Sequence, residues 1–202
     1  MIIEVHPQTP NPRKIAAAAE ILRNGGLVSY PCDTTYAVGC DLFNKKAVDL
    51  LYRVLKKDKK KLLSCIIYDI SELSKFVKIP DSAYKSMRRL LPGPYTFILK
   101  GNTMLPKATL TKRKTAGIRM PANKVCEALQ KEFGGPVLSG ALRNIDDSII
   151  NTPYEIEEKA GHCIDMILDG GRCPGAPSSI VDFSSGSPVI IREGSGDISI
   201  LT

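Results

Sequence analysis

The feature that most constrains the fold is the alternation, along the whole chain, of helix-period segments with short apolar runs bounded by Gly or Pro. Residues 13–24 carry apolar side chains at the i, i+3, i+4, i+7 spacing of a helix, which Gly25 ends, and residues 27–30 form a short apolar run. The same patterns predict further helices at residues 47–55, 81–91, 122–133 and 153–160. They predict further strands at residues 2–5, 64–68, 95–99, 116–120, 136–141, 164–168, 179–183 and 188–192. Because helices and strands alternate to the end of the chain, we expect an α/β fold with a mixed sheet.

With 43% apolar residues, the chain of 202 residues can bury a core. It shows no repeat, low-complexity tract or linker, so we expect a single domain over residues 1–202. No run approaches the roughly 18 apolar residues of a membrane helix, and the first residues lack the pattern of a secretion signal. The six cysteines form no C-x-x-C pair and only two histidines are present, so we expect reduced thiols, no structural metal and a cytoplasmic protein.

Basic residues are concentrated in two stretches of a chain whose net charge is +7. The first stretch contributes Arg53, Lys56, Lys57, Lys59, Lys60 and Lys61. The second runs from residue 100 to residue 124 without an acidic residue and includes Lys112, Arg113, Lys114 and Arg119. Arg53, Lys56 and Lys57 stand at i, i+3 and i+4, so we expect them to share one helix face. Two such stretches indicate a positive surface that binds several phosphates, although a lysine run taken alone is more often a solvated helix face.

A polar turn follows one of the predicted strands. Asp33, Thr34 and Thr35 come directly after residues 27–30, and ligands of open α/β sheets bind at this position. An ordinary turn rich in Asp and Thr fits these residues equally well. Ser139, after residues 136–138, makes the same argument more weakly. The chain has no P-loop, G-x-G-x-x-G or G-x-S-x-G motif, and its aromatic content of 6% without tryptophan gives little support for base stacking.

Five ordered segments resemble the motifs of the YrdC/YciO family. They are YPCDTTYAVGC at residues 30–40 after Gly25-Gly26, PGPYTFIL at 92–99, KRKTAGIRMP at 112–121, APSSIVD at 176–182 and IREGSG at 191–196. These segments span nearly the whole chain, and the sequences KRKT and REGSG resemble the YciO-like branch most.

The resemblance implies a single YrdC-like domain, in which a twisted mixed sheet with helices encloses a large, positively charged, concave cavity. In the family's threonylcarbamoyl-AMP synthase branch, L-threonine, bicarbonate and ATP condense with release of pyrophosphate, and Mg²⁺ accompanies the ATP. The product serves the threonylcarbamoylation of a tRNA adenosine beside the anticodon. The expected small partners are therefore ATP or AMP, L-threonine and bicarbonate.

The family pattern also implies roles for individual residues. Thr34, Arg119, Ser139 and Ser179 would bind the threonine, with Arg119 holding its carboxylate through a bidentate fork. Lys56, Lys57, Thr115 and Arg192 would bind the nucleotide and its phosphates. Catalysis of this kind needs positioning and electrostatic stabilisation rather than a nucleophilic side chain.

Two motifs depart from the synthase pattern. The place of K-x-R-P reads LKKD at residues 55–58, so Lys57 replaces an arginine fork. The place of S-x-S-x-N reads SGALR at residues 139–143, so Ala141 and Arg143 replace a hydroxyl and an amide. Losing such a hydroxyl costs about 1–3 kcal/mol.

These departures leave alternatives open. One is a double-stranded RNA-binding module that uses the same basic cavity, with residues 53–61 and 112–114 as its face, and whose partner is tRNA or another structured RNA. Another is a related hydrolase or transferase that acts on threonylcarbamoyl compounds or on another nucleotide.

Overall fold

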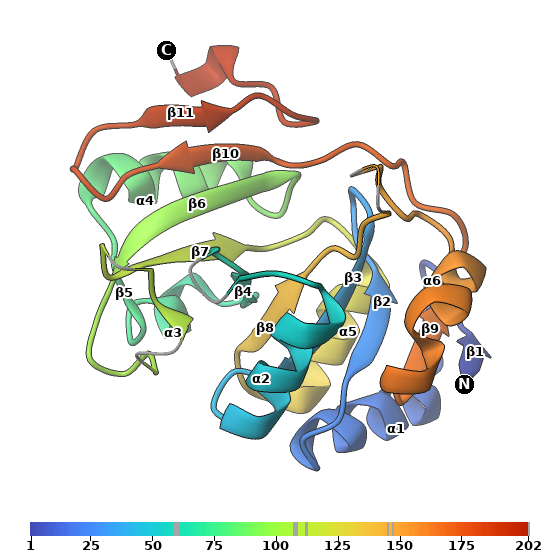
Figure 1. Ribbon diagram of the computed structural model, residues 1–202. Helices are drawn as coiled ribbons and strands as arrows, with labels where there is room; N and C mark the ends of the chain where they lie inside the picture. Colours follow the sequence, from blue (N-terminus) through green and yellow to red (C-terminus); the bar gives the residue numbers. More distant parts are fainter. Residues whose placement is uncertain (59–60, 107–108, 112, 145, 147, 202) are drawn as a thin grey trace.

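A computed structural model describes residues 1–58, 61–106, 109–111, 113–144, 146 and 148–201 of the chain (Figure 1). The strands are β1 (Ile2–Glu4), β2 (Val28–Pro31), β3 (Tyr36–Asp41), β4 (Ser64–Ile66), β5 (Val77–Lys78), β6 (Tyr95–Gly101), β7 (Thr115–Arg119), β8 (Val137–Gly140), β9 (Met166–Asp169), β10 (Ser179–Asp182) and β11 (Val189–Arg192). The helices are α1 (Pro12–Arg23), α2 (Lys45–Val54), α3 (Ile70–Leu73), α4 (Asp81–Leu90), α5 (Lys124–Phe133) and α6 (Pro153–Ala160), with 3-10 turns at Gly161–Cys163 and Ser199–Leu201.

The strands form one mixed sheet in the order β1-β9-β2-β3-β8-β4-β7-β6-β10-β11, with β5 paired to β6. Parallel pairs such as β4 with β7 and β6 with β10 alternate with antiparallel pairs such as β2 with β3 and β6 with β7. The predicted α/β fold with a mixed sheet is confirmed. Among the described residues, no helix combines the length and the apolar character needed to cross a membrane.

The predicted elements match the structure with a few exceptions. Residues 36–41, for which no strand was predicted, form the strand β3, which pairs with β2 in the middle of the sheet. The helix α3 and the strand β5 were not predicted, because four and two residues are too short to show a periodic pattern. The helix α2 ends at Val54, so Lys56 and Lys57 lie beyond it, and the prediction that they share a helix face with Arg53 is wrong.

The two faces of the sheet are covered by different helices. Side chains that alternate along each strand point to opposite faces, and they divide between two apolar clusters. One cluster contains residues of α2, α4 and α6, and the other contains residues of α1 and α5. In Figure 1, α2 lies in front of β8 and α5 lies behind it.

The face that α1 and α5 cover is left open toward the C-terminal strands. Val137 on β8 and Ile66 on β4 pack in the α1–α5 cluster. On the same face, Ser64 lies opposite Ser139 and Gly117, and alternation along β6 and β7 places Thr96 and Arg119 on this face as well. These positions are polar or small, and the next section shows that they line a hollow.

The strand β11 closes the sheet at one edge. It pairs only with β10 among the described strands, and Val189, Ile190 and Ile191 are 49%, 39% and 56% exposed. Neither face of β11 is therefore packed as closely as the inner strands are.

We predict that the native protein presents one readily reactive thiol. All six cysteines are free, and only Cys163 is partly exposed. Burial raises the pKa of Cys65 to about 12, and burial followed by the charge of Cys32 raises that of Cys173 to about 12, so both stay protonated and unreactive at pH 8. Titration with a thiol reagent should modify about one thiol per chain in the folded protein and all six after denaturation. Rapid modification of more than two thiols in the native protein would contradict the burial pattern.

Candidate functional site

A hollow of about 330 Å³, here called the sheet pocket, opens on the uncovered part of the sheet. Its polar and charged lining residues are Thr34, Thr35, Lys57, Ser64, Thr96, Arg119, Ser139, Arg143, Ser178 and Arg192. Lys57, Arg119, Arg143 and Arg192 give it four cations, and no Asp or Glu is among its lining residues in the described part of the chain. The sheet pocket therefore suits an anionic ligand.

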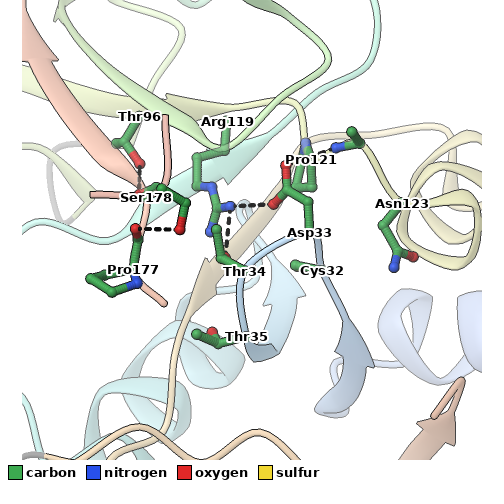
Figure 2. A network of polar contacts seen from close by, with 12 residues as sticks. Cys32, Asp33, Thr34, Thr35, Thr96, Arg119, Pro121, Asn123, Pro177 and Ser178 are labelled. Carbon is green, nitrogen blue, oxygen red and sulfur yellow. Dashed lines mark hydrogen bonds and ion pairs between the residues drawn. The ribbon is translucent and has the colours of Figure 1, made fainter. Parts of the chain in front are cut away.

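The best-held cation of the sheet pocket is Arg119, the last residue of β7. Its Nη2 donates to Asp33 Oδ1 at 2.7 Å and to Thr34 Oγ1 at 3.0 Å (Figure 2). The side chains of Arg119 and Asp33 are only 13% and 8% exposed. The Arg119 Nε is buried and has no hydrogen-bond partner among the described residues. A buried, unsatisfied donor on a guanidinium at a pocket wall is a position where a carboxylate or phosphate oxygen gains the most.

The turn between β2 and β3 brings Asp33 and Thr34 to this place. Asp33 Oδ2 accepts a hydrogen bond from the Ala122 amide at 2.9 Å, so both carboxylate oxygens are engaged. The Thr34 carbonyl accepts a hydrogen bond from the Gly175 amide at 2.8 Å. The turn is thus fixed to the β7–α5 connection on one side and to the β9–β10 connection on the other.

A second polar group lies on the opposite side of Arg119 in Figure 2. Ser178 and Thr96 share a hydrogen bond of 2.8 Å between their hydroxyls. Arg192 donates from Nε and Nη2 to the Ser178 carbonyl, at 3.0 and 2.8 Å. Burial, followed by the charges of Arg143 and Arg119, lowers the pKa of Arg192 from its usual value. Mutual repulsion among these guanidiniums favours an anion between them.

A hydrogen bond from a buried tyrosine orients the Ser139 hydroxyl. The buried Tyr30 hydroxyl donates to Ser139 Oγ at 2.8 Å, which leaves the Ser139 proton available to another acceptor. Burial above all raises the pKa of Tyr30, so Tyr30 remains a donor at physiological pH. Ser139 lines the sheet pocket and is 3% exposed.

A second hollow of about 370 Å³, here called the lysine hollow, adjoins the sheet pocket. Among the described residues its charged lining consists of Lys56, Lys57, Lys61, Arg143 and Lys159. Lys57, Ala141 and Arg143 line both hollows and so separate them. Arg53 lines a third hollow of about 350 Å³, which shares Lys56 and Lys159 with the lysine hollow.

The predicted site residues therefore fall into groups. Thr34, Lys57, Arg119, Ser139 and Arg192 meet at the sheet pocket, and Arg53, Lys56 and Lys61 lie at the adjoining hollows. Ser179 is fully buried, and its hydroxyl donates to the Gly196 carbonyl and accepts from the Gly194 amide.

Thr115 and the neighbouring basic residues are remote from the sheet pocket. Thr115 stands at the opposite end of β7 from Arg119, about 13 Å away by strand rise, with its hydroxyl 2.7 Å from that of Thr111. Arg113 and Lys114 are exposed on the β6–β7 connection. Lys59, Lys60 and Lys112 lie outside the described residues.

The sequence analysis named Asp33 as part of the polar turn but did not predict its ion pair with Arg119. It assigned no role to Ser178, a neighbour of Ser179, or to Thr96, which follows a Pro-Gly-Pro turn in a strand that otherwise reads as apolar. A hydroxyl in an apolar strand was the available signal for Thr96. Among the described residues, no group of three or more His, Cys, Asp or Glu side chains is arranged to hold a metal ion.

Comparison with known proteins decides the family. Residues 20–194 match the Sua5/YciO/YrdC family model, which is described as "Telomere recombination". The chain belongs to this family. It is 38% identical over 195 residues to an uncharacterised protein of Haemophilus influenzae, covering 95% of this chain and 94% of that protein. It is 36% identical over 196 residues to YciO of Escherichia coli, covering 96% of this chain and 95% of that protein.

Solved structures agree with this assignment. The crystal structure of E. coli YciO superposes with a TM-score of 0.95 at 34% identity, covering all of this chain and 99% of that chain. The crystal structure of Pyrococcus abyssi Sua5 complexed with L-threonine superposes with a TM-score of 0.90 at 26% identity, covering 96% of this chain and 57% of that chain. The P. abyssi relative, a threonylcarbamoyl-AMP synthase, is 26% identical over 183 residues, which are 90% of this chain and 54% of that protein.

We predict strong energetic coupling between Asp33 and Arg119. Replacing Asp33 with Ala leaves a nearly buried guanidinium without its counter-charge, which should lower the free energy of unfolding by about 3 kcal/mol. A double-mutant cycle with Arg119→Ala, measured by urea unfolding, should give a coupling of at least about 1.5 kcal/mol. The more exposed pair Glu127–Lys131 is the control, with an expected coupling below about 1 kcal/mol. Equal coupling energies in the two pairs would contradict the prediction that burial strengthens the interaction between Asp33 and Arg119.

A further prediction concerns the backbone where the chain leaves α2. Lys56 has φ of 50°, in the left-handed region that costs a residue with a side chain about 1–2 kcal/mol. Glycine avoids this cost but loses about 0.5–1 kcal/mol more in unfolded-state entropy. Lys56→Gly should therefore raise the free energy of unfolding by about 0.5 kcal/mol. Lys56→Ala, which keeps the strain, should not raise it, and a stabilisation by Ala as large as that by Gly would argue against strain.

Proposed function

We propose that this protein forms threonylcarbamoyl-adenylate from ATP, L-threonine and bicarbonate, with Mg²⁺ entering on the nucleotide phosphates. The single observation that carries the proposal is Arg119, a nearly buried guanidinium that Asp33 and Thr34 hold at the sheet pocket while its Nε has no partner among the described residues. The structural similarity to P. abyssi Sua5, solved with L-threonine, supports the same choice of amino acid.

In the proposed reaction the threonine amine adds to bicarbonate, and water is lost to give the N-carboxylate. A carbamate oxygen then attacks the α-phosphorus of ATP, and the bond between the α-phosphorus and the bridging oxygen breaks. Pyrophosphate leaves with the bond's electron pair, and the product is the mixed anhydride. Through this product the protein would serve the threonylcarbamoylation of tRNA.

In this proposal, different residues of the sheet pocket bind the amino acid and the phosphates. Arg119 would bind the threonine carboxylate, and Thr34 and Ser139 would contact the amino acid with their hydroxyls. Arg192, Arg143 and Lys57 would stabilise the phosphates as charge moves toward the leaving group. Lys57 and Arg143 differ from the synthase pattern, but both line the sheet pocket, so positive charge is retained where a hydroxyl and an amide are lost.

The test is formation of pyrophosphate and of a threonine-containing adenylate when all three substrates are present. Product should require L-threonine and bicarbonate. Arg119→Lys replaces a two-pronged fork with a point charge and should lower kcat/KM for threonine at least about 10-fold. Arg88→Lys, on an exposed face of α4, is the matched control and should leave the rate unchanged.

Two results would reject the proposal. One is the absence of pyrophosphate above background at enzyme concentrations stoichiometric with ATP. The other is pyrophosphate release that does not depend on threonine, which would indicate a different acceptor for the adenylyl group.

Binding of structured or double-stranded RNA stays a prediction. The observation in its favour is that cations continue beyond the sheet pocket to Arg53, Lys61 and Lys159. The placement of Arg113 and Lys114 on a different connection means that the two basic stretches do not line one continuous wall of the sheet pocket.

A further inference from the structure

The lysine hollow combines an unusual density of positive charge with a small volume. Five cationic side chains line a space of about 370 Å³, and its described lining residues include no Asp or Glu. Asp146 lies near enough for Lys159 to contribute to the lowering of its pKa, after larger effects of hydrogen bonds to Ser148, but Asp146 does not line the hollow. The cations come from the segment after α2, from the segment after β8 and from α6, so three parts of the fold contribute them.

The small volume of the lysine hollow and its five cations favour a compact anion. A sphere of this volume is about 9 Å across, and one nucleic-acid strand brings only about two to three charges into that length. An anion that concentrates several charges on two phosphorus centres matches five cations better. The backbone supports this arrangement, because the left-handed Lys56 turns the chain where α2 ends and places consecutive lysines at the hollow.

The lysine hollow also has a specific relation to the sheet pocket. Lys57 and Arg143 line both spaces, whereas the residues expected to hold threonine, Arg119 and Thr34, line only the sheet pocket. A leaving group released beside Lys57 and Arg143 would therefore meet further cations on the far side of the same two residues.

We propose that the lysine hollow is a binding site for inorganic pyrophosphate, in which Lys61 and Lys159 hold the leaving group after Lys57 and Arg143 have released it from the sheet pocket. This assignment rests on the proposed adenylate chemistry, and it deepens that proposal by separating the exit of the two products. Lys61 and Lys159 belong to none of the motifs that identify the family in this chain.

The test measures pyrophosphate binding directly, by calorimetric titration of magnesium pyrophosphate into the protein without ATP or threonine. The double variant Lys61→Ala with Lys159→Ala should raise the pyrophosphate Kd at least about 10-fold, as expected for losing two charge-assisted contacts. The control is Lys45→Ala with Lys85→Ala, which removes the same charge from exposed positions of α2 and α4 and should change Kd less than about twofold. The Kd for L-threonine should be unchanged in both.

Three results would overturn the proposal. They are undetectable binding of pyrophosphate to the wild-type protein, an equal loss of affinity in both double variants, and an RNA duplex that binds through Lys61 and Lys159 while pyrophosphate does not. If the protein makes the adenylate but binds no pyrophosphate at the lysine hollow, only the proposed exit site is rejected. Pyrophosphate binding that depends on Lys61 and Lys159 without any synthesis would instead reject the adenylate chemistry.

Discussion

The carboxylate of Asp33 joins segments that are distant in the sequence. One of its oxygens accepts from Arg119 at the end of β7 and the other from the Ala122 amide before α5, while Asp33 itself stands in the turn between β2 and β3. A charged group is stable at 8% exposure only when its oxygens are satisfied, and here each oxygen has a donor. The pair engages the Arg119 Nη2, whereas the buried Nε has no hydrogen-bond partner among the described residues.

The sheet pocket differs from the synthase pattern in some of its polar groups but keeps four cationic side chains, Lys57, Arg119, Arg143 and Arg192. Ala141 and Arg143 stand where the synthase pattern has a hydroxyl and an amide, and Lys57 stands where it has an arginine. A hydroxyl orients one oxygen through a directional bond, whereas a guanidinium acts over a longer range and holds two oxygens. Under the proposed function, replacing the amide with Arg143 while losing the hydroxyl at Ala141 would change the orientation of a phosphate more than its affinity.

The sequence was sufficient for the mixed sheet except β3 and β5 and for the position of the polar turn at Asp33 and Thr34, but insufficient for contacts between distant segments. Helices such as α1 and α5 can be predicted from the spacing of their apolar residues and from the glycine that follows them. The strand β3 was obscured because it follows a polar turn and is buried on both sides, so it lacks the alternation of a surface strand. Lys159 could not be assigned to the lysine hollow, because an isolated lysine on α6 gives no local sign that it meets the segment after α2. Asp33 and Arg119 are 86 residues apart, and only the family resemblance hinted that their segments meet.

The strands that line the sheet pocket differ in how many neighbouring strands they pair with, so the two walls of the pocket should differ in rigidity. The Thr34 turn connects β2 and β3, each flanked by another strand, so moving it would break hydrogen bonds on both sides of the hairpin. Arg192 and Ile191 belong to β11, which pairs with one strand in the described part of the chain and has an exposed apolar surface. Local opening costs least where backbone bonds are few and side chains are poorly packed. The wall beside Arg192 should therefore open at a lower free-energy cost than the wall beside Thr34. Under the proposed function, the wall beside Arg192 would move during nucleotide exchange, and the wall beside Thr34 would keep fixed dimensions around the amino acid.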